Sequence, residues 1–471
     1  MRPVAGDSSL YTTGVLDGSP ARPVETKVIA GYGATTAALV VFVCRVLIAS
    51  AVVPPWQGPD EPTHFALATL VAQGTFTQQA TADIERATLQ SMSRHGWWRF
   101  YQEPTPDPLP YAFSQVPEHL ASGTLDQPAY YILASAVLST VGDSDIDRQY
   151  LALRLLSIAL ALLTLLFGWL GTRGFFGSGT ATGTIALVSL HPQFLLSAIS
   201  VNPDVLIDLC GAFVWWQTSR LAGLQPRGRV MAIVLVASAS LVAAFSKRNG
   251  LPLALVSLVA TSLILRTTDR RLRLRIAVAG VVVALGCVAA AYVIGGYSES
   301  VGRLWTYWGS AVVARRSLAD LTPSALLLFV KAAIDTAWLY AGWLRFPPPA
   351  MWAWVARTLT IVGLGGAAWL ALRRKSNTVA FLLAWTFVAV YACTLLGIAF
   401  ISAAAPQGRY VFAVMFPFAA LLWRGLLYSF RPVLKAYAPV AIVGIVAALD
   451  TCGFVFVLLP AYVYHGAAAA F

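Results

Sequence analysis

The stretch that decides the fold is VIAGYGATTAALVVFVCRVLIASAVV, residues Val28 to Val53. About 20 predominantly apolar residues in a helix are enough to cross the roughly 30 Å hydrocarbon core of a bilayer. The stretch is too long for the core of a signal peptide, and no small-residue cleavage site follows it. We therefore expect a transmembrane helix that the mature protein retains.

Similar apolar stretches recur along almost the whole chain. Of its 471 residues, 58% are hydrophobic and 11% are charged, whereas soluble domains carry about 25% charged residues. This composition predicts an all-α polytopic bundle of about eleven spans and leaves no room for a soluble domain of ordinary size. We expect the spans near residues 28–53, 148–171, 177–199, 203–220, 229–246, 251–266, 274–296, 350–372, 378–402, 410–430 and 437–459.

Basic clusters predict the orientation of the bundle. Residues 220–229, 266–275, 373–375 and 431–435 are rich in Arg and Lys, and such loops stay on the cytoplasmic side. The same rule accounts for the net charge of +12 without nucleic acid as a partner. Residues 1–27 are polar with scattered Gly, Pro and Ser, which predicts a disordered tail, and the orientation of the bundle places this tail in the cytoplasm. We expect residues 28–471 to form a single transmembrane domain.

Two long loops then lie on the outer face, residues 54–127 and 296–349. The apolar segments 128–141 and 323–342 are ambiguous. Counting residues 128–141 as a span would place the basic loops outside, so we expect an interfacial helix there. The five cysteines lie in apolar segments, which favours neither disulfides nor a zinc site. No Walker A, HExxH or GxSxG pattern occurs, so we expect no nucleotide cofactor.

Acidic residues concentrate in the first outer loop. It holds eight of the 21 acidic residues of the chain. In PDEPTHFALATLVAQG, Pro62 fits the first position of a helix, Asp60 or Glu61 fits its cap, and Gly74 fits its end. One helical turn can bring either acid close to His64. The alternative is that both acids merely cap a solvated helix and that His64 is a hydrogen-bonded structural residue.

Basic residues lie at the predicted outer ends of two spans. Arg409, with Tyr410 beside it in QGRY, can hold a lipid phosphate through its forked donors, or it can snorkel to lipid headgroups. Lys247 and Arg248 in FSKRNG lie outside, against the positive-inside trend. Basic residues in that position favour an anionic partner.

Other candidates have weaker support. In VNPDVLIDL, capping of a helix explains Asn202 and Asp204. Asp208 lies one turn deeper, and an acid within a span is usually paired or functional. Trp97 and Trp98 suit aromatic anchors in the first outer loop. The second outer loop has the pattern of an interfacial helix over residues 301–316, with Arg303, Arg315 and Arg316.

The long first span followed by an acidic pair and a large outer loop resembles the GT-C superfamily of integral-membrane glycosyltransferases. Four segments resemble more closely the bacterial multi-pass family called domain of unknown function 2142: PDEPTHF (59–65), HPQFLLSAISVNPD (191–204), YAGWLRFPPP (340–349) and PQGRYVFAVMFP (406–417). Their order and spacing together carry the resemblance. The chain departs from that family at DQPAYY (126–131), so no role is carried over to Asp126.

The resemblance implies an inverting glycosyltransferase in the bacterial cytoplasmic membrane. A polyprenyl-phosphate-linked sugar would be the donor, a glycan or lipid-linked molecule the acceptor, and a cell-envelope glycan the product on the extracytoplasmic face. Asp60 would be the base, and Glu61 would position the acceptor or a divalent cation, Mg²⁺ or Mn²⁺, with Asp60. The lipid phosphate would bind at four residues, and four others would support the site or contact the acceptor. The residues for the lipid phosphate are Arg409, Tyr410, Lys247 and Arg248. The supporting or acceptor-contacting residues are His64, Asp208, Trp97 and Trp98.

Two other functions stay open. One is a transporter or flippase of lipid-linked glycans, which should show internal repeats and ionisable residues near the bilayer midplane. The other is a glycan polymerase or ligase that depends on outer-loop arginines. The sequence identifies neither the sugar, the acceptor nor the prenyl chain length.

Overall fold

The computed structural model describes residues 23–100, 103–116, 120, 127–142, 144–221, 224–265, 322–373, 378–401 and 407–463. Several predictions fall outside these residues. They concern most of the N-terminal tail, the span near 274–296, residues 296–321 of the second outer loop with Arg303, Arg315 and Arg316, and Asp126.

The described residues confirm the all-α prediction. Their only β-type pairing is an isolated bridge between Ala341 and Phe346. The helices are α1 (Pro23–Val52), α2 (Glu61–Gln73), α3 (Gln78–Arg94), α4 (Trp97–Phe100), η1 (Phe113–Gln115), α5 (Pro128–Val141), α6 (Ile146–Phe176), α7 (Ser178–Ser189), α8 (Pro192–Ala198), α9 (Asp204–Leu221), α10 (Pro226–Ala244), η2 (Arg248–Gly250), α11 (Leu251–Leu265), α14 (Pro323–Trp338), α15 (Ala350–Leu372), α16 (Thr378–Ile401), η4 (Gly408–Val414), α17 (Met415–Ser429), η5 (Pro432–Leu434), α18 (Ala438–Gly453), η6 (Phe454–Leu458) and α19 (Leu459–Tyr462).

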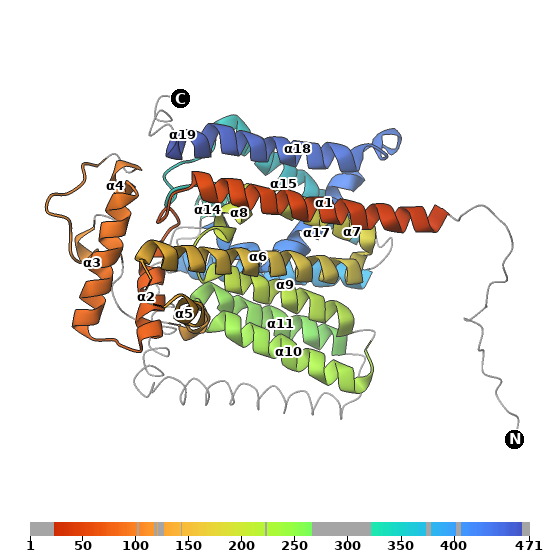
Figure 1. Cartoon of the computed structure of the whole chain (residues 1–471). Coiled ribbons are helices and arrows are strands. Elements are labelled where there is room, and N and C mark those ends of the chain that lie inside the picture. Colours follow the sequence, from red (N-terminus) through yellow and green to blue (C-terminus); the bar gives the residue numbers. More distant parts are fainter. Residues whose placement is uncertain are drawn as a thin grey trace, which may run out of the picture.

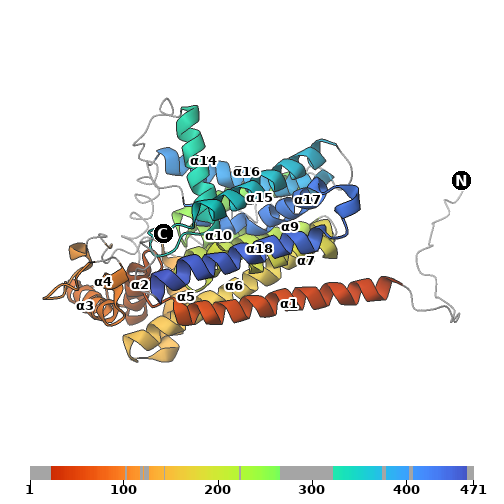
Figure 2. The ribbon, with the colours of Figure 1, turned by 90° about the horizontal axis from the view of Figure 1, so that it is seen from above.

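The long helices form a multi-pass membrane bundle. Among the described residues, six helical stretches are long and apolar enough to cross a bilayer: Tyr32–Val52, Ile146–Phe176, Arg227–Ala244, Ala350–Leu372, Gly408–Ser429 and Ala438–Tyr462. Helices α1, α6, α9, α10 and α18 run alongside one another in two perpendicular views (Figures 1 and 2). The total of eleven spans stays a prediction.

The predicted span 177–199 is divided into two helices, α7 and α8. Helix α7 ends at Ser189, and α8 begins at Pro192, whose ring carries no backbone N–H to continue the helix. The imidazole of His191 caps α8, because its Nδ1 accepts a hydrogen bond of 3.3 Å from the backbone N–H of Phe194. The break leads into the loop that precedes α9.

The first outer loop forms a helical layer across one end of the bundle. Helices α2, α3 and α4 lie at the left end of the molecule in both views, where α2 and α3 cross the direction of the long helices (Figures 1 and 2). Helix α5 is seen nearly end-on where the long helices run across the picture, an orientation that fits the interfacial helix expected at residues 128–141 (Figure 1). We call this end of the bundle the site end.

Local signals in the sequence account for the boundaries of α2. Pro62 lies in its first turn, and Gly74 ends it with a left-handed φ of 63°. The N–H of Gly74 bonds back to the carbonyls of Leu70 and Val71. The predicted beginning and end of this helix are therefore confirmed.

A close backbone contact joins α9 to η4, the segment that begins at Gly408. A Cβ atom added at Gly211 of α9 would lie 1.9 Å from the carbonyl oxygen of Ala413. Only glycine allows this approach, because a backbone carbonyl cannot move aside as a flexible side chain can. The contact brings η4 against the first turns of α9.

We predict that Gly211→Ala destabilises the protein by about 1–3 kcal/mol, the usual cost of overpacking a close contact. The measurement is the thermal unfolding temperature of the purified protein in detergent. Gly444→Ala in α18 is the matched control, because a Cβ atom there meets nothing within 4 Å. Equal unfolding temperatures for the two variants would contradict the contact.

Candidate active site

Glu61 is the buried centre of the acidic segment. Its side chain is fully buried, and its Oε2 accepts a hydrogen bond of 2.7 Å from the N–H of Gly58. Its Oε1 accepts bonds of 3.0 Å from the hydroxyl of Tyr150 in α6 and 2.8 Å from the N–H of Val201. Burial raises the pKa of Glu61, although Arg154 and these hydrogen bonds oppose the rise. The carboxyl group thus ties the loop before α2 to α6 and to the loop before α9.

Arg154 supports the same loop from α6. Its Nη1 donates to the carbonyls of Ser50 (3.2 Å) and Val53 (3.1 Å), and its Nη2 donates to that of Pro54 (3.3 Å). Carbonyl groups at a helix C-terminus have no partner within the helix and carry partial negative charge. The guanidinium therefore fixes the end of α1 and the direction in which the chain leaves it.

Asp60 lies beside Glu61 in sequence but faces a different environment. It occupies the N-cap position of α2 with φ 62° and ψ 7°, and its exposed side chain makes no capping hydrogen bond. Asp60 therefore occupies the capping position that the sequence predicts, but its carboxylate makes no capping hydrogen bond. The Asp60 carboxylate nevertheless interacts electrostatically with three residues of the site, His64, Lys247 and Arg409. The acidic pair therefore consists of one exposed and one buried carboxyl group.

His64 has the contacts of a structural residue, which was one of the two interpretations left open. Its Nδ1 lies 2.8 Å from the hydroxyl of Tyr131, and its ring is buried. Burial, and to a smaller extent the charge of Lys247, lowers its pKa to about 3. The imidazole is therefore neutral at physiological pH.

A cluster of charged side chains forms around Asp204, at the beginning of α9. Lys247 Nζ lies 3.2 Å from its Oδ1, and Arg409 Nε lies 3.9 Å from its Oδ2. The amide of Asn249 donates to Oδ1 at 2.9 Å. We call Asp204, Lys247, Asn249, Arg409 and Tyr410 the cation cluster, because the Tyr410 ring lies under both cations, 5.3 Å from Lys247 Nζ and 5.4 Å from Arg409 Cζ.

The cation cluster brings together three of the four residues expected to hold phosphate, Lys247, Arg409 and Tyr410. The side chain of Arg248 lies outside the described part of the structure. Burial by itself would lower the pKa of Lys247, but the carboxylate of Asp204 outweighs that effect and the pKa is raised. Arg409 is 6% exposed, and its Nε and Nη2 have no hydrogen-bond partner in the described part of the chain. The cluster therefore contains two cations, and one of them, Arg409, has N–H groups that are available to bind a ligand.

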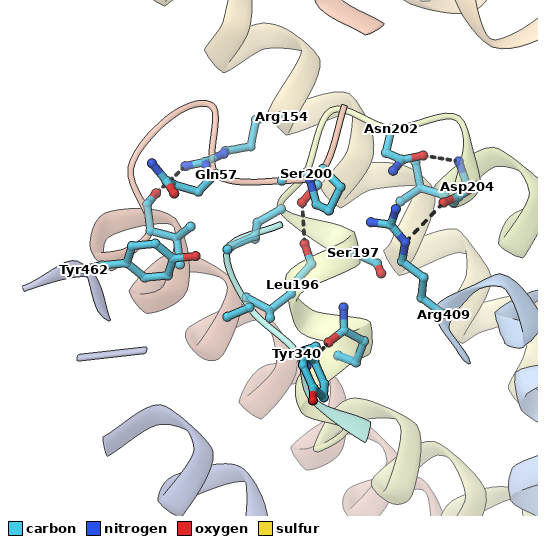
Figure 3. Close-up of a pocket in the computed structure, with 18 residues that line it drawn as sticks. Gln57, Arg154, Leu196, Ser197, Ser200, Asn202, Asp204, Tyr340, Arg409 and Tyr462 are labelled. Carbon is cyan, nitrogen blue, oxygen red and sulfur yellow. Dashed lines mark hydrogen bonds and ion pairs between the residues drawn. The ribbon is translucent and has the colours of Figure 1, made fainter. Parts of the chain in front are cut away.

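The cation cluster borders a pocket at the site end (Figure 3). Arg409, Asp204 and Asn202 line one side of the pocket, and Gln57, Arg154 and Tyr462 line the other, with Ser197 and Ser200 between them. The cavity volume is about 30 Å³, which is room for roughly one or two water molecules. Binding of a sugar at this place would therefore require the walls of the pocket to move apart.

The remaining candidates lie inside the protein. Asp208 is buried one turn beyond Asp204 on α9, and its Oδ2 has no hydrogen-bond partner among the described atoms. Trp97 and Trp98 are each 1% exposed, and their rings pack edge to face with 4.8 Å between the ring centroids. The Trp97 ring also packs edge to face against Trp343, with 6.1 Å between the centroids. Both indoles brace the outer layer instead of presenting an open face to an acceptor.

The predicted pair of metal ligands does not have the geometry of one site. Both oxygens of Glu61 already accept hydrogen bonds, from three donors in total, while Asp60 faces outward. Within the described residues, no group of three or more His, Cys, Asp and Glu side chains could hold a metal ion. A divalent cation bound by both carboxylates does not fit this donor set.

Sequence reasoning missed Gln57, Asn249, Tyr150 and Arg154. Asn249 has a local signal, since it follows Lys247 closely in FSKRNG. Tyr150 and Arg154 lie one turn apart at the beginning of a long span, where a tyrosine and an arginine are usual interfacial residues. Their contacts with the Glu61 loop depend on chain crossings about 90 to 100 residues apart in sequence. No local pattern predicts such crossings.

The fold is similar to that of solved membrane proteins. ArnT from Cupriavidus metallidurans bound to undecaprenyl phosphate aligns with 89% of this chain at a TM-score of 0.53 and 18% identity. The apo state of that protein gives a TM-score of 0.51. The oligosaccharyltransferase of Archaeoglobus fulgidus aligns more weakly, with a TM-score of 0.41 and 14% identity.

No family model and no curated protein matches the sequence. The alignment covers 64% of the length of ArnT. At this level of identity the likeness shows the fold alone, which is a polytopic helical bundle like that of ArnT.

The contacts of Glu61 give a direct prediction for Glu61→Gln. The amide would turn N–H donors towards a region that already supplies three of them, leaving at least one buried group unpaired at a cost of about 1–3 kcal/mol. We expect a lower thermal unfolding temperature in detergent. The control is Glu103→Gln, at an exposed position in the same outer loop. If Glu61→Gln unfolds at the wild-type temperature, Glu61 does not hold these segments together.

Proposed function

We propose that this protein is an inverting glycosyltransferase that uses a polyprenyl-phosphate-linked sugar. The observation that carries the proposal is the cation cluster, in which Arg409 lines the pocket and Lys247 pairs with the same Asp204 carboxylate. The carboxylate of exposed Asp60 acts electrostatically on both cations. Such a site offers positive charge for a departing phosphate and a carboxylate for an attacking hydroxyl group. These are the two requirements of the reaction.

The phosphate of the donor would bind at Arg409. Its unpartnered Nε and Nη2 can donate to phosphate oxygens, and the charged ammonium group of Lys247 adds to the attraction. Asp204 keeps these two cations side by side in the absence of substrate. As the bond between the anomeric carbon and the phosphate oxygen breaks, the electron pair passes to the phosphate, where the cations stabilise it.

Asp60 is the proposed base. It would remove the proton of the acceptor hydroxyl group while that oxygen attacks the anomeric carbon from the side opposite the phosphate, which inverts the configuration. Its exposure at the N-terminus of α2 allows an acceptor to reach it from the site end. Glu61 acts by holding the Asp60 loop in position.

Several further features belong to the proposal. The complex of ArnT with undecaprenyl phosphate supports a lipid-phosphate ligand for this fold. We further propose a bacterial cytoplasmic membrane, a cytoplasmic N-terminus, an extracytoplasmic site built on residues 54–127 within a single domain, and membership of the family of domain of unknown function 2142. The acceptor would be a glycan or lipid-linked molecule of the cell envelope.

A flippase of lipid-linked glycans is the second candidate. The observation that favours it is Asp208, a buried carboxyl group with an unpartnered oxygen in the interior of the bundle. Ionisable groups inside a bundle often mark transport pathways. The candidate requires movement of lipid across the bilayer without transfer of sugar.

The deciding experiment measures transfer of radiolabelled sugar from a panel of undecaprenyl-phosphate donors to cell-envelope acceptors, with purified protein in lipid. We predict that Asp60→Asn loses about 10²–10⁴-fold in transfer rate, the usual contribution of a general base, and still binds donor. Arg409→Gln should instead weaken donor binding by roughly tenfold or more.

The matched control is Asp83→Asn, on the exposed surface of α3, which should transfer at the wild-type rate. Normal transfer by Asp60→Asn would show that the base is another residue. Movement of labelled lipid across vesicles, with no transfer to any acceptor, would favour the flippase.

A further inference from the structure

The side of the pocket opposite the cation cluster contains a buried amide with no partner. Gln57 is 2% exposed and lines the pocket, and neither its Oε1 nor its Nε2 has a hydrogen-bond partner among the described atoms (Figure 3). Buried polar side chains in native proteins nearly always have such partners. A ligand that offers both hydroxyl oxygens and hydroxyl hydrogens would satisfy the two ends of this amide.

The backbone holds Gln57 in place from both sides. The preceding Trp56 is fully buried with a left-handed φ of 70°, and its indole donates to Ser91 Oγ at 2.9 Å. The carbonyl of Trp56 accepts a hydrogen bond of 3.2 Å from the Trp343 indole. On the other side, Gly58 donates to Glu61. Gln57 therefore has little freedom to find a partner elsewhere in the protein.

Backbone strain gathers in the loops around this pocket. In the described part of the chain, the non-glycine residues with positive φ are Trp56, Asp60, Trp343 and Leu344. All four belong to the two loops that supply Gln57, Gly58 and Pro59, and Tyr340, Ala341 and Gly342, to the pocket wall. Strained backbone of this kind tends to cluster at ligand sites.

The charges around the pocket leave no excess of cations. The described cations at or near its wall are Arg154, Lys247 and Arg409, and the acidic residues are Asp60, Glu61, Asp204 and Asp208. Arg154 already uses Nη1 and Nη2 for backbone carbonyls, which leaves only its Nε unpaired. A phosphate at Arg409 would add one negative charge, and an acidic sugar would add a second in a buried place with no spare cation described. Burial of an uncompensated charge is strongly unfavourable.

We propose that the Gln57 side of the pocket binds the donor sugar and selects an uncharged one, with the Gln57 amide bonding neighbouring hydroxyl groups on the ring. The inference rests on the proposed function, because a phosphate held at Arg409 would direct its attached sugar into the pocket. Ser197 and Ser200 line the wall between the two sides. Gln57 is thus a specificity-determining residue for the donor.

The test compares binding of four ligands to the full chain in lipid nanodiscs: undecaprenyl phosphate alone, and undecaprenyl phosphate carrying glucose, mannose or glucuronate. In the wild type, at least one neutral sugar should tighten binding by roughly tenfold or more over the bare lipid phosphate, and glucuronate should not. Gln57→Leu should lose the gain from the sugar and keep the affinity for undecaprenyl phosphate.

Two further variants guard against a structural explanation. Gln57→Glu has nearly the same shape but lacks the N–H donors, so it should also lose the gain from a neutral sugar. Gln78→Leu makes the same change as Gln57→Leu at an exposed position on α3, and it should bind all four ligands as the wild type does.

Monodeoxy versions of the preferred sugar provide a thermodynamic cycle. Removal of one ring hydroxyl should weaken binding to the wild type but leave binding to Gln57→Leu unchanged, because the partner of that hydroxyl is already missing. A merely structural role for Gln57 would give the same penalty in both proteins.

The outcomes separate this inference from the proposed function. If the wild type binds the bare lipid phosphate but gains nothing from a neutral sugar, or gains most from glucuronate, the inference is wrong and the phosphate site stands. Retention of the full gain by Gln57→Leu would likewise refute the role of Gln57. Failure of the wild type to bind undecaprenyl phosphate at all would refute the proposed function itself.

Discussion

The site end of this protein depends on one buried carboxyl group. Glu61 accepts hydrogen bonds from Gly58, Tyr150 and Val201, which belong to three segments that are far apart in the sequence. Removal of a carboxyl group from water is costly unless hydrogen bonds replace the lost solvation. The same three bonds fix the loop that carries Asp60, the wall that contains Gln57 and the loop that leads into Asp204.

A second constraint acts on the cation cluster. Lys247 and Arg409 are largely buried and would repel each other if they were alone, but Asp204 lies between them and compensates part of their charge. The distance of 3.9 Å from Arg409 Nε to the carboxylate is longer than a hydrogen bond. Arg409 is therefore attracted electrostatically to Asp204 while some of its N–H donors remain without a hydrogen bond. This arrangement suits a group that must bind a phosphate and later release it.

Composition and local pattern were sufficient to predict the fold class and many helix boundaries. The all-α bundle follows from repeated long apolar stretches, and the limits of α2 follow from Pro62 and Gly74. The break between α7 and α8 differs from the single span predicted at residues 177–199. Pro192 marks the break, but the whole segment is apolar and therefore has the hydropathy of one span. Hydropathy detects burial in lipid but not the ending of a helix inside it.

The candidate site was predicted in part. The charges of Lys247 and Arg409 stood out in the sequence because they contradict the positive-inside trend, and the structure brings them together. The different environments of Asp60 and Glu61 could not be predicted, since adjacent residues share every local signal. Only the positions of Tyr150 and Val201 decide which carboxyl group is buried. Gln57 carries no charge, so its importance emerges only from its burial and its unpartnered amide.

The central claim is that the cation cluster holds a lipid-linked phosphate, and an experimental structure of the protein with undecaprenyl phosphate in a lipid nanodisc tests it most directly. The account predicts phosphate oxygens at the pocket, within hydrogen-bond distance of Arg409 Nη2 and Lys247 Nζ. A phosphate bound elsewhere, with Arg409 still beside Asp204 and Tyr410 as it is here, would contradict the account.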